Sequence, residues 1–162
     1  MASTDLTAQQ LRERLQYNPT TGIFIWIASR VSWCANGSVA GSVSSKRCIC
    51  IRLRPHSYLA HRLAWLYMTG EWPRNQIDHI NGNSFDNRWE NLRDVSARVN
   101  AQNRRTSKNL SGLLGVRFNG QKWEARIMDQ GKAYKIGLFD GAQQAQDAYL
   151  NAKRELHEGC TI

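Results

Sequence analysis

The sequence predicts an α+β fold divided between two domains. Short segments that alternate apolar and polar residues, bounded by Asn, Gly and Pro, are typical of antiparallel strands, and only a few segments carry apolar residues at helical spacing. A polar stretch without apolar periodicity then separates two such groups of elements, at residues 104–112. We therefore expect a first domain at residues 1–104, a linker at 105–112 and a second domain at 113–162.

The first domain is expected to combine short strands with three helices. Leu6, Leu11 and Leu15 form the apolar stripe of a short N-terminal helix. Gly70 is typical of a helix C-terminus, and Asn81-Gly82 is typical of a tight turn between strands. The remaining elements expected in order are a turn at 18–22, strands at 23–27 and 48–54, a helix at 58–69, strands at 76–80 and 91–93, and a helix that runs to about residue 104.

The second domain is expected to be a small antiparallel sheet packed on one helix. Three short strands at 115–118, 122–128 and 133–139 are separated by turns at Asn119-Gly120 and Gln130-Gly131. The helix that follows, at 141–157, has an apolar stripe at steps of three and four residues. That stripe consists of Ala145, Ala148, Tyr149, Ala152 and Leu156.

The charge of the chain is concentrated in one segment. The formal net charge is +9, and residues 101–135 hold eight basic and two acidic residues. Such a concentration is the expected footprint of a polyanionic partner, and the alternative is a solvated basic face.

Nothing in the sequence indicates a membrane or an oxidising compartment. The N-terminus is polar, and no apolar segment approaches the length of a membrane span. The four cysteines do not have the spacing of a zinc site. We expect a cytoplasmic protein with reduced thiols, no membrane contact and no obligate protein partner.

Four polar residues of the first domain suit phosphodiester hydrolysis. Hydrolysis requires a base for water and a cation for the developing charge. His79 can take a proton near neutral pH, and Asp78 and Asn100 offer the oxygen ligands that Mg²⁺ prefers. Asn91 could hold the His79 ring in the required tautomer.

The segment that carries these residues resembles the HNH endonucleases of phages and mobile introns. The resemblance rests on IDHINGN at 77–83, WENLR at 89–93 and RVN at 98–100, and extends to YNPTTGIFIW at 17–26 and AHRLAW at 60–65. It implies a ββα-metal core within residues 58–104, with His79 as general base and Asn91 orienting it. It also implies one divalent ion held by Asp78 and Asn100, most simply Mg²⁺ with Mn²⁺ as an alternative, which stabilises the leaving 3′ oxygen.

Several further residues of the first domain are candidates for contact with the site or with DNA. Arg88, Arg93, Arg104 and Arg105 can contact phosphate, and for Arg88 and Arg93 surface ion pairs are the alternative. His61 is interpreted as a satisfied, packed histidine, with contact to the site as the alternative.

The second domain resembles the ethylene-response-factor-like DNA-binding domain, over residues 111–157. The resemblance rests on GVR at 115–117, WEARI at 123–127 and IGLFD at 136–140, followed by the alanine-rich helix. It implies that the sheet enters the major groove of duplex DNA. The residues expected to contact DNA are Arg117, Lys122, Trp123, Arg126, Lys132 and Lys135.

The function that follows is a metal-dependent DNA endonuclease of phage or mobile-element type. One alternative is a sequence-specific DNA-binding regulator that retains an inactive nuclease fold. Another is a protein that binds or cleaves RNA.

Overall fold

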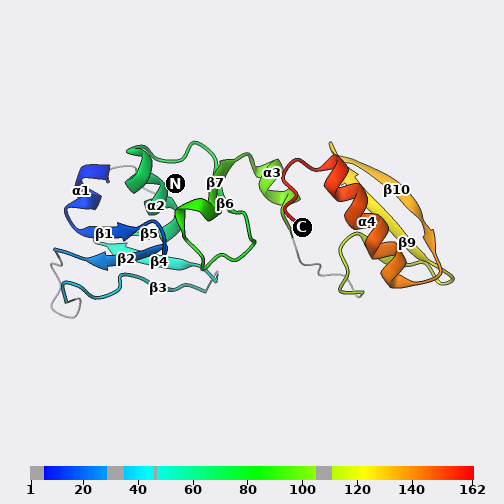
Figure 1. The fold of residues 1–162 in the computed structure, drawn as a ribbon, viewed down its shortest axis with the longest axis horizontal. Helices are drawn as coiled ribbons and strands as arrows, with labels where there is room; N and C mark the ends of the chain where they lie inside the picture. Colours follow the sequence, from blue (N-terminus) through cyan, green and yellow to red (C-terminus); the bar gives the residue numbers. More distant parts are fainter. Residues whose placement is uncertain (1–5, 29–34, 46, 105–110) are drawn as a thin grey trace. The chain divides into compact units, whose positions relative to one another are not determined.

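The computed structural model describes residues 6–28, 35–45, 47–104 and 111–162. The chain forms two compact units, Met1–Ser96 and Ala97–Ile162 (Figure 1). The described part contains four α-helices and several small antiparallel sheets, which agrees with the expected α+β class. No helix in these ranges is long and apolar enough to cross a membrane.

The first unit contains two helices and three small sheets. All strand pairs in these sheets are antiparallel: β1 with β2, β3 with β4, β4 with β5, and β6 with β7. In chain order the elements are α1 (Ala8–Arg12), β1 (Leu15–Asn18), β2 (Ile23–Trp26), β3 (Ser42–Val43), β4 (Ile49–Leu53), β5 (His56–Leu59), α2 (Ala60–Thr69), β6 (Gln76–His79), a 3-10 turn at Trp89–Asn91, and β7 (Leu92–Val95).

Local sequence explains where the helices of this unit begin and end. Thr7 caps α1 through a capping box with Gln10, which uses two backbone N–H groups that the helix itself leaves unpaired. Gly70 ends α2 in the left-handed conformation at φ 85°. The unit has one apolar core, to which α1, α2 and strands of all three sheets contribute.

Two strands of the first unit differ from the expectation. Leu15 was expected on the N-terminal helix, but it begins β1 and pairs with Trp26, and both Leu11 and Leu15 are buried in the core. Tyr58 was expected on the helix at 58–69, but it lies on β5 opposite Ile51, so that α2 starts at Ala60. Pairing with a neighbouring strand outweighed helical spacing at both places.

The second unit consists of a three-stranded sheet, a long helix that packs on it and a short helix. Strand β9 lies between β8 and β10, and α4 packs along one face of the sheet (Figure 1). The core between them consists of Val116, Ala125, Ile127, Ala145 and Tyr149. The elements are α3 (Ala97–Gln102), β8 (Val116–Phe118), β9 (Trp123–Asp129), β10 (Lys132–Phe139) and α4 (Ala142–Leu156). The three strands and the helix expected for this region are thus present.

The boundary between the units falls earlier than the expected end of the first domain at residue 104. It lies between Ser96 and Ala97, so α3 belongs to the second unit. There the C-terminal tail contacts α3, since the Gly159 N–H donates to Gln102 Oε1 at 3.2 Å, and α4 contacts the residues after α3, since Lys153 Nζ donates to the Arg104 carbonyl oxygen at 2.7 Å.

Candidate functional site

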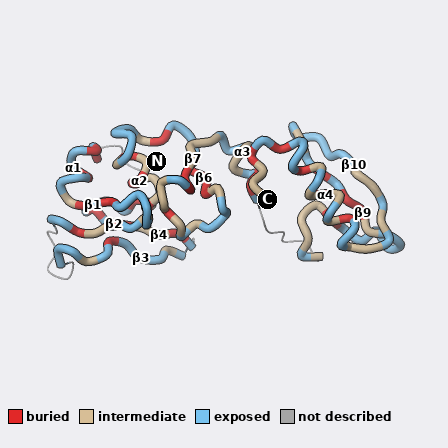
Figure 2. The backbone as a smooth tube through the Cα atoms, in the orientation of Figure 1, coloured by how far each residue is buried: buried red, intermediate tan, exposed pale blue. Residues whose placement is uncertain are grey.

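Asp78 and His79 are the last two residues of β6 and are both buried. Their exposed fractions are 6% and 8%, in a strand that is buried along most of its length (Figure 2). The strand ends at His79, because Gly82, at φ 73°, turns the chain back and its N–H donates to the His79 carbonyl oxygen at 2.8 Å. Neighbouring residues of a regular strand point to opposite faces, so a site that uses both side chains requires such an end.

The register of the β6–β7 hairpin pairs Asp78 with a cation. Asp78 lies opposite Arg93, and the Arg93 Nε and Nη2 both donate to Asp78 Oδ2, at 2.9 and 2.8 Å. Arg93 was expected to contact DNA phosphate or to form a surface ion pair; the structure pairs it with a buried carboxylate. The guanidinium compensates the negative charge that burial would otherwise make costly.

The His79 ring contacts two side chains from outside its own strand. His79 Nε2 lies 3.0 Å from Asn87 Oδ1, and the His61 ring lies perpendicular to it with centroids 5.1 Å apart. A carboxamide oxygen only accepts, so Nε2 carries the proton in this contact. In the neutral ring the lone pair then lies on Nδ1.

Asn91 closes the loop between the two strands. Its Oδ1 accepts from the Asn81 N–H at 2.9 Å, and its Nδ2 donates to the Asp86 carbonyl oxygen at 2.7 Å. Asn91 is expected to hold the His79 ring, and that role stays a prediction; the structure shows a ring contact from Asn87, which the sequence did not single out. Asn87 was missed because one asparagine in a polar loop gives no periodic signal, and its role depends on the conformation of the loop.

The same loop carries a cluster of charged side chains. Arg88 donates to both oxygens of Asp86, at 2.9 and 2.8 Å, and to Glu90 at 2.8 Å. The hydrogen bonds from Arg88 lower the pKa of Asp86 to about 2. Arg88 therefore forms ion pairs, and its contact with DNA phosphate stays a prediction.

Two of the predicted residues lie on or beside α3 in the second unit. Asn100 is half-buried on this helix, and Arg104 is exposed just after it. Arg105 lies outside the described residues.

The outer face of the second unit's sheet is basic. Alternate residues of a strand point to opposite faces, and Ala125 and Ile127 face α4, so Glu124 and Arg126 point outward. The register places Arg117 beside Glu124 and Lys135 beside Arg126. Arg117 and Arg126 form ion pairs with Glu124, at 2.7 and 3.4 Å, and Lys122 pairs with Asp140 at 3.0 Å.

Two of the residues predicted to bind DNA lie elsewhere on this sheet. Trp123 is half-buried against the core and contacts Phe118, with ring centroids 5.2 Å apart. Lys132 begins β10 at the end of the sheet and is exposed.

The donor atoms available for a metal ion are oxygens. The described residues include no group of three or more His, Cys, Asp and Glu side chains that could hold a metal. A carboxylate such as that of Asp78 is the kind of oxygen donor that Mg²⁺ prefers, whereas Asn100, the other expected ligand, belongs to the second unit.

Comparison with known proteins gives the family of the chain. Residues 58–102 match the HNH endonuclease family, which is the segment that holds His79 and Asn87 and for which DNA is the substrate. Protein 3.8 of Escherichia phage T7 is 31% identical over 101 residues, which cover 60% of this chain and 83% of the phage protein. No solved structure matches the chain. The chain therefore belongs to the family of this phage protein and carries an HNH endonuclease domain at residues 58–102.

Proposed function

We propose that the chain is a metal-dependent DNA endonuclease in which His79 is the general base. The observation that carries the proposal is the contact between His79 Nε2 and Asn87 Oδ1, because it holds the ring of a buried histidine in one tautomer and one orientation beside the carboxylate of Asp78. The buried carboxylate of Asp78 next to it is a proposed ligand of the cation that hydrolysis of a phosphodiester also requires.

His79 would act on the water that attacks phosphorus. Nδ1 takes a proton from this water as its oxygen bonds to phosphorus, the bond from phosphorus to the 3′ oxygen breaks, and the released 3′ oxygen takes a proton from solvent. Asp78 and Asn100 are the proposed metal ligands, Asn100 on the sequence resemblance alone. When bound, a divalent ion such as Mg²⁺ supplies positive charge for the developing negative charge on the leaving oxygen.

The second unit would supply affinity for duplex DNA. Three of its basic residues lie on the outer face of the sheet, namely Arg117, Arg126 and Lys135, and Lys122 lies in the turn directly before β9. A twisted sheet with such a face suits the major groove, as in ethylene-response-factor-like domains. We propose that this face, and not Trp123, makes the contact, since Trp123 packs against the core.

A second candidate is a DNA-binding regulator without cleavage activity. The ion pair between Asp78 and Arg93 favours it, because a carboxylate with a guanidinium already bound has less need of a metal ion.

Cleavage of supercoiled plasmid DNA distinguishes the two candidates. With Mg²⁺ the wild-type chain should nick or linearise the plasmid, and EDTA should stop it. His79→Ala should reduce the rate by roughly 10²–10⁴-fold, the usual contribution of a general base, while binding of the same DNA stays nearly unchanged. A variant that retains more than about a tenth of the rate would contradict the role of His79. Binding without cleavage by the wild type would favour the regulator.

A further inference from the structure

The loop that carries Asn87 is attached to the N-terminal β1–β2 hairpin at three points. The Tyr17 hydroxyl donates to the Asn87 carbonyl oxygen at 2.6 Å, and the Trp89 N–H donates to the Pro19 carbonyl oxygen at 2.9 Å. A Cβ placed on Gly22, which has φ 73°, would lie 2.4 Å from the Asn87 carbonyl carbon. The hairpin backbone therefore lies directly against the loop at Asn87, and only glycine fits there.

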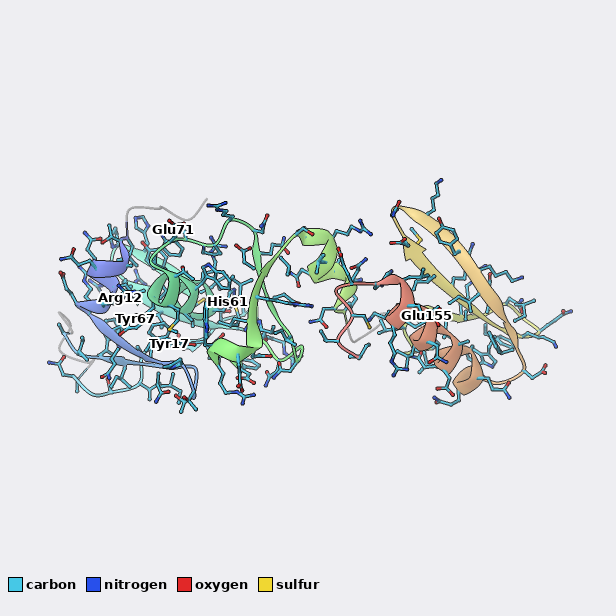
Figure 3. The ribbon with its side chains drawn as sticks, turned by 45° about the horizontal axis from the view of Figure 1, so that its top comes forward. Arg12, Tyr17, His61, Tyr67, Glu71 and Glu155 are labelled. Carbon is cyan, nitrogen blue, oxygen red and sulfur yellow. The ribbon has the colours of Figure 1, made fainter. Side chains whose placement is uncertain are left out.

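Tyr17 is held rigidly by the core of the first unit. It is 4% exposed, and its ring packs against Phe24 and Tyr67 with centroid distances of 4.7 and 5.7 Å. Tyr67 in turn lies under the Arg12 guanidinium, so Tyr17, Tyr67 and Arg12 form one group beside α2 (Figure 3). Burial raises the pKa of Tyr17, so its hydroxyl remains a hydrogen-bond donor at all physiological pH values.

Asn87 forms hydrogen bonds both with Tyr17 of this rigid group and with His79. Its carbonyl oxygen accepts from Tyr17, and its side-chain oxygen accepts from His79 Nε2 at 3.0 Å. Asn87 is 3% exposed, so water has little access to either bond. Fixing the backbone of Asn87 restricts its side-chain rotamer, and thereby the tautomer and orientation of the His79 ring.

We propose that Tyr17 is a positioning residue for His79 and acts through Asn87. Its hydroxyl keeps the Asn87 oxygen on Nε2, so that Nδ1 of His79 is presented to water. The consequence for catalysis rests on the proposed function, but the effect on the His79 ring does not. Tyr17 and Gly22 lie outside residues 58–102, so part of the machinery of the site comes from outside the segment that matches the HNH family.

The tautomer of His79 is the direct test. Nitrogen-15 spectra of the histidine side chains in the full-length protein at pH about 8, where an unperturbed histidine is neutral, should show His79 with its proton on Nε2. Tyr17→Phe keeps the ring contacts and removes the hydroxyl, and it should give a mixture of the two tautomers. Gly22→Ala, which displaces the hairpin without altering Tyr17, should have the same effect, so the test does not depend on one variant folding. Tyr67→Phe is the matched control and should leave the His79 signals unchanged. A folded Tyr17→Phe protein with an unaltered His79 tautomer would overturn the proposal.

Cleavage kinetics provide the second readout. Tyr17→Phe should lower kcat about tenfold, a part of the roughly 10²–10⁴-fold contribution of a general base, with KM and DNA affinity unchanged. In the Asn87→Ala background, Tyr17→Phe should cause no further loss, because the two residues act in series. Additive losses would contradict the connection through Asn87. If the wild type cleaves no DNA, the proposed nuclease function fails, whereas the spectra still decide the positioning role.

Discussion

At the level of single residues, Asp78 is the side chain whose charge matters most to the site. It is buried, and Arg93 supplies two hydrogen bonds to one of its oxygens. A buried carboxylate that loses a cationic partner is strongly destabilised, which favours binding of another cation. Arg93 and a divalent ion would therefore compete for the same negative charge.

This competition predicts the effect of Arg93→Gln on metal binding. The variant should bind Mn²⁺ about tenfold more tightly or better. A tenfold change in affinity corresponds to only about 1.4 kcal/mol, and the free-energy cost of leaving a buried charge without its partner is larger. It should also unfold at lower denaturant concentration without metal. Calorimetric titration of the full-length protein measures the affinity. Arg74→Gln is the control, since only the backbone N–H of Arg74 contacts Asp94. Weaker binding by Arg93→Gln would mean that Arg93 does not oppose the metal.

The two proposed ligands can be tested in the same titration. Asp78→Ala and Asn100→Ala should each weaken Mn²⁺ binding and slow DNA cleavage, because each removes one oxygen donor from a small ligand set. Asp78→Ala should have the larger effect, since it also removes a charge. If both variants bind Mn²⁺ like the wild type, the ion is held by other residues.

Single residues could be predicted from the sequence where their role depends on adjacent residues in the chain, and could not where it depends on distant ones. Asp78 and His79 are adjacent and precede an Asn-Gly turn, and the structure ends β6 there as expected. Asn87 and Tyr17 act through contacts 8 and 70 residues apart in the chain, and no local pattern indicates such contacts. Arg93 could be singled out, but its partner follows from strand register, which depends on the turn between the strands.

At the level of elements, α2 contributes His61 to the surroundings of His79. His61 was interpreted as a satisfied, packed histidine, but its Nδ1 is buried without a hydrogen-bond partner among the described residues. Burial, followed by the nearby His79 and Arg62, lowers the pKa of His61 to about 4 from 6.5. The folded protein therefore excludes a proton that the unfolded chain would bind between these pH values.

This difference predicts that the first unit loses stability in mild acid. The contribution of the neutral His61 to the free energy of unfolding is fully present above about pH 6.5. It is lost as the pH falls to about 4, since only the unfolded state gains the proton in this range. His61→Phe should stabilise the protein more at pH 5 than at pH 7.5. Urea unfolding at both pH values measures the difference, and Asp86 does not interfere because its pKa lies near 2. An equal effect of the substitution at both pH values would show that His61 takes up its proton in the folded state.

Prediction of whole elements succeeded where one pattern dominated. Helix α4 and strands β8 to β10 have clear periodicity and turn residues, and they were expected within one or two residues of their observed bounds. Strands β1 and β5 were missed because Leu15 and Tyr58 also fit the apolar spacing of a helix. Such short apolar segments are decided by tertiary pairing, which the local sequence does not contain.

At the level of the whole molecule, each unit has its own core. The residues proposed for catalysis and the basic residues proposed for DNA binding lie in different units. His79, Asn87 and Tyr17 belong to the first unit, whereas the basic outer face of the sheet belongs to the second. Truncation near residue 105 would remove Gly159 and Lys153, which form hydrogen bonds with Gln102 of α3 and with Arg104. Separate roles for the units are therefore better tested by substitution in the full-length protein.

The salt dependence of DNA binding tests whether the basic residues of the second unit contact phosphates. Lys135 lies on the outer face and Lys122 in the turn directly before β9, and their replacement leaves intact the pairs that Arg117 and Arg126 form with Glu124. If each lysine contacts one phosphate, Lys122→Gln combined with Lys135→Gln should reduce the slope of log K against log salt concentration by about 1.8, since each contact with duplex DNA contributes about 0.9. Arg154→Gln on α4 is the control for loss of charge, because α4 covers the other face of the sheet, and it should leave the slope unchanged. Binding isotherms of a short duplex between about 50 and 200 mM salt give the slopes. Cleavage by the double variant should be restored at low salt, because the substitutions leave His79 and Asn87 untouched. A slope equal to that of the wild type would mean that the sheet binds something other than DNA, and the affinity of the chain for DNA would then have to come from the first unit.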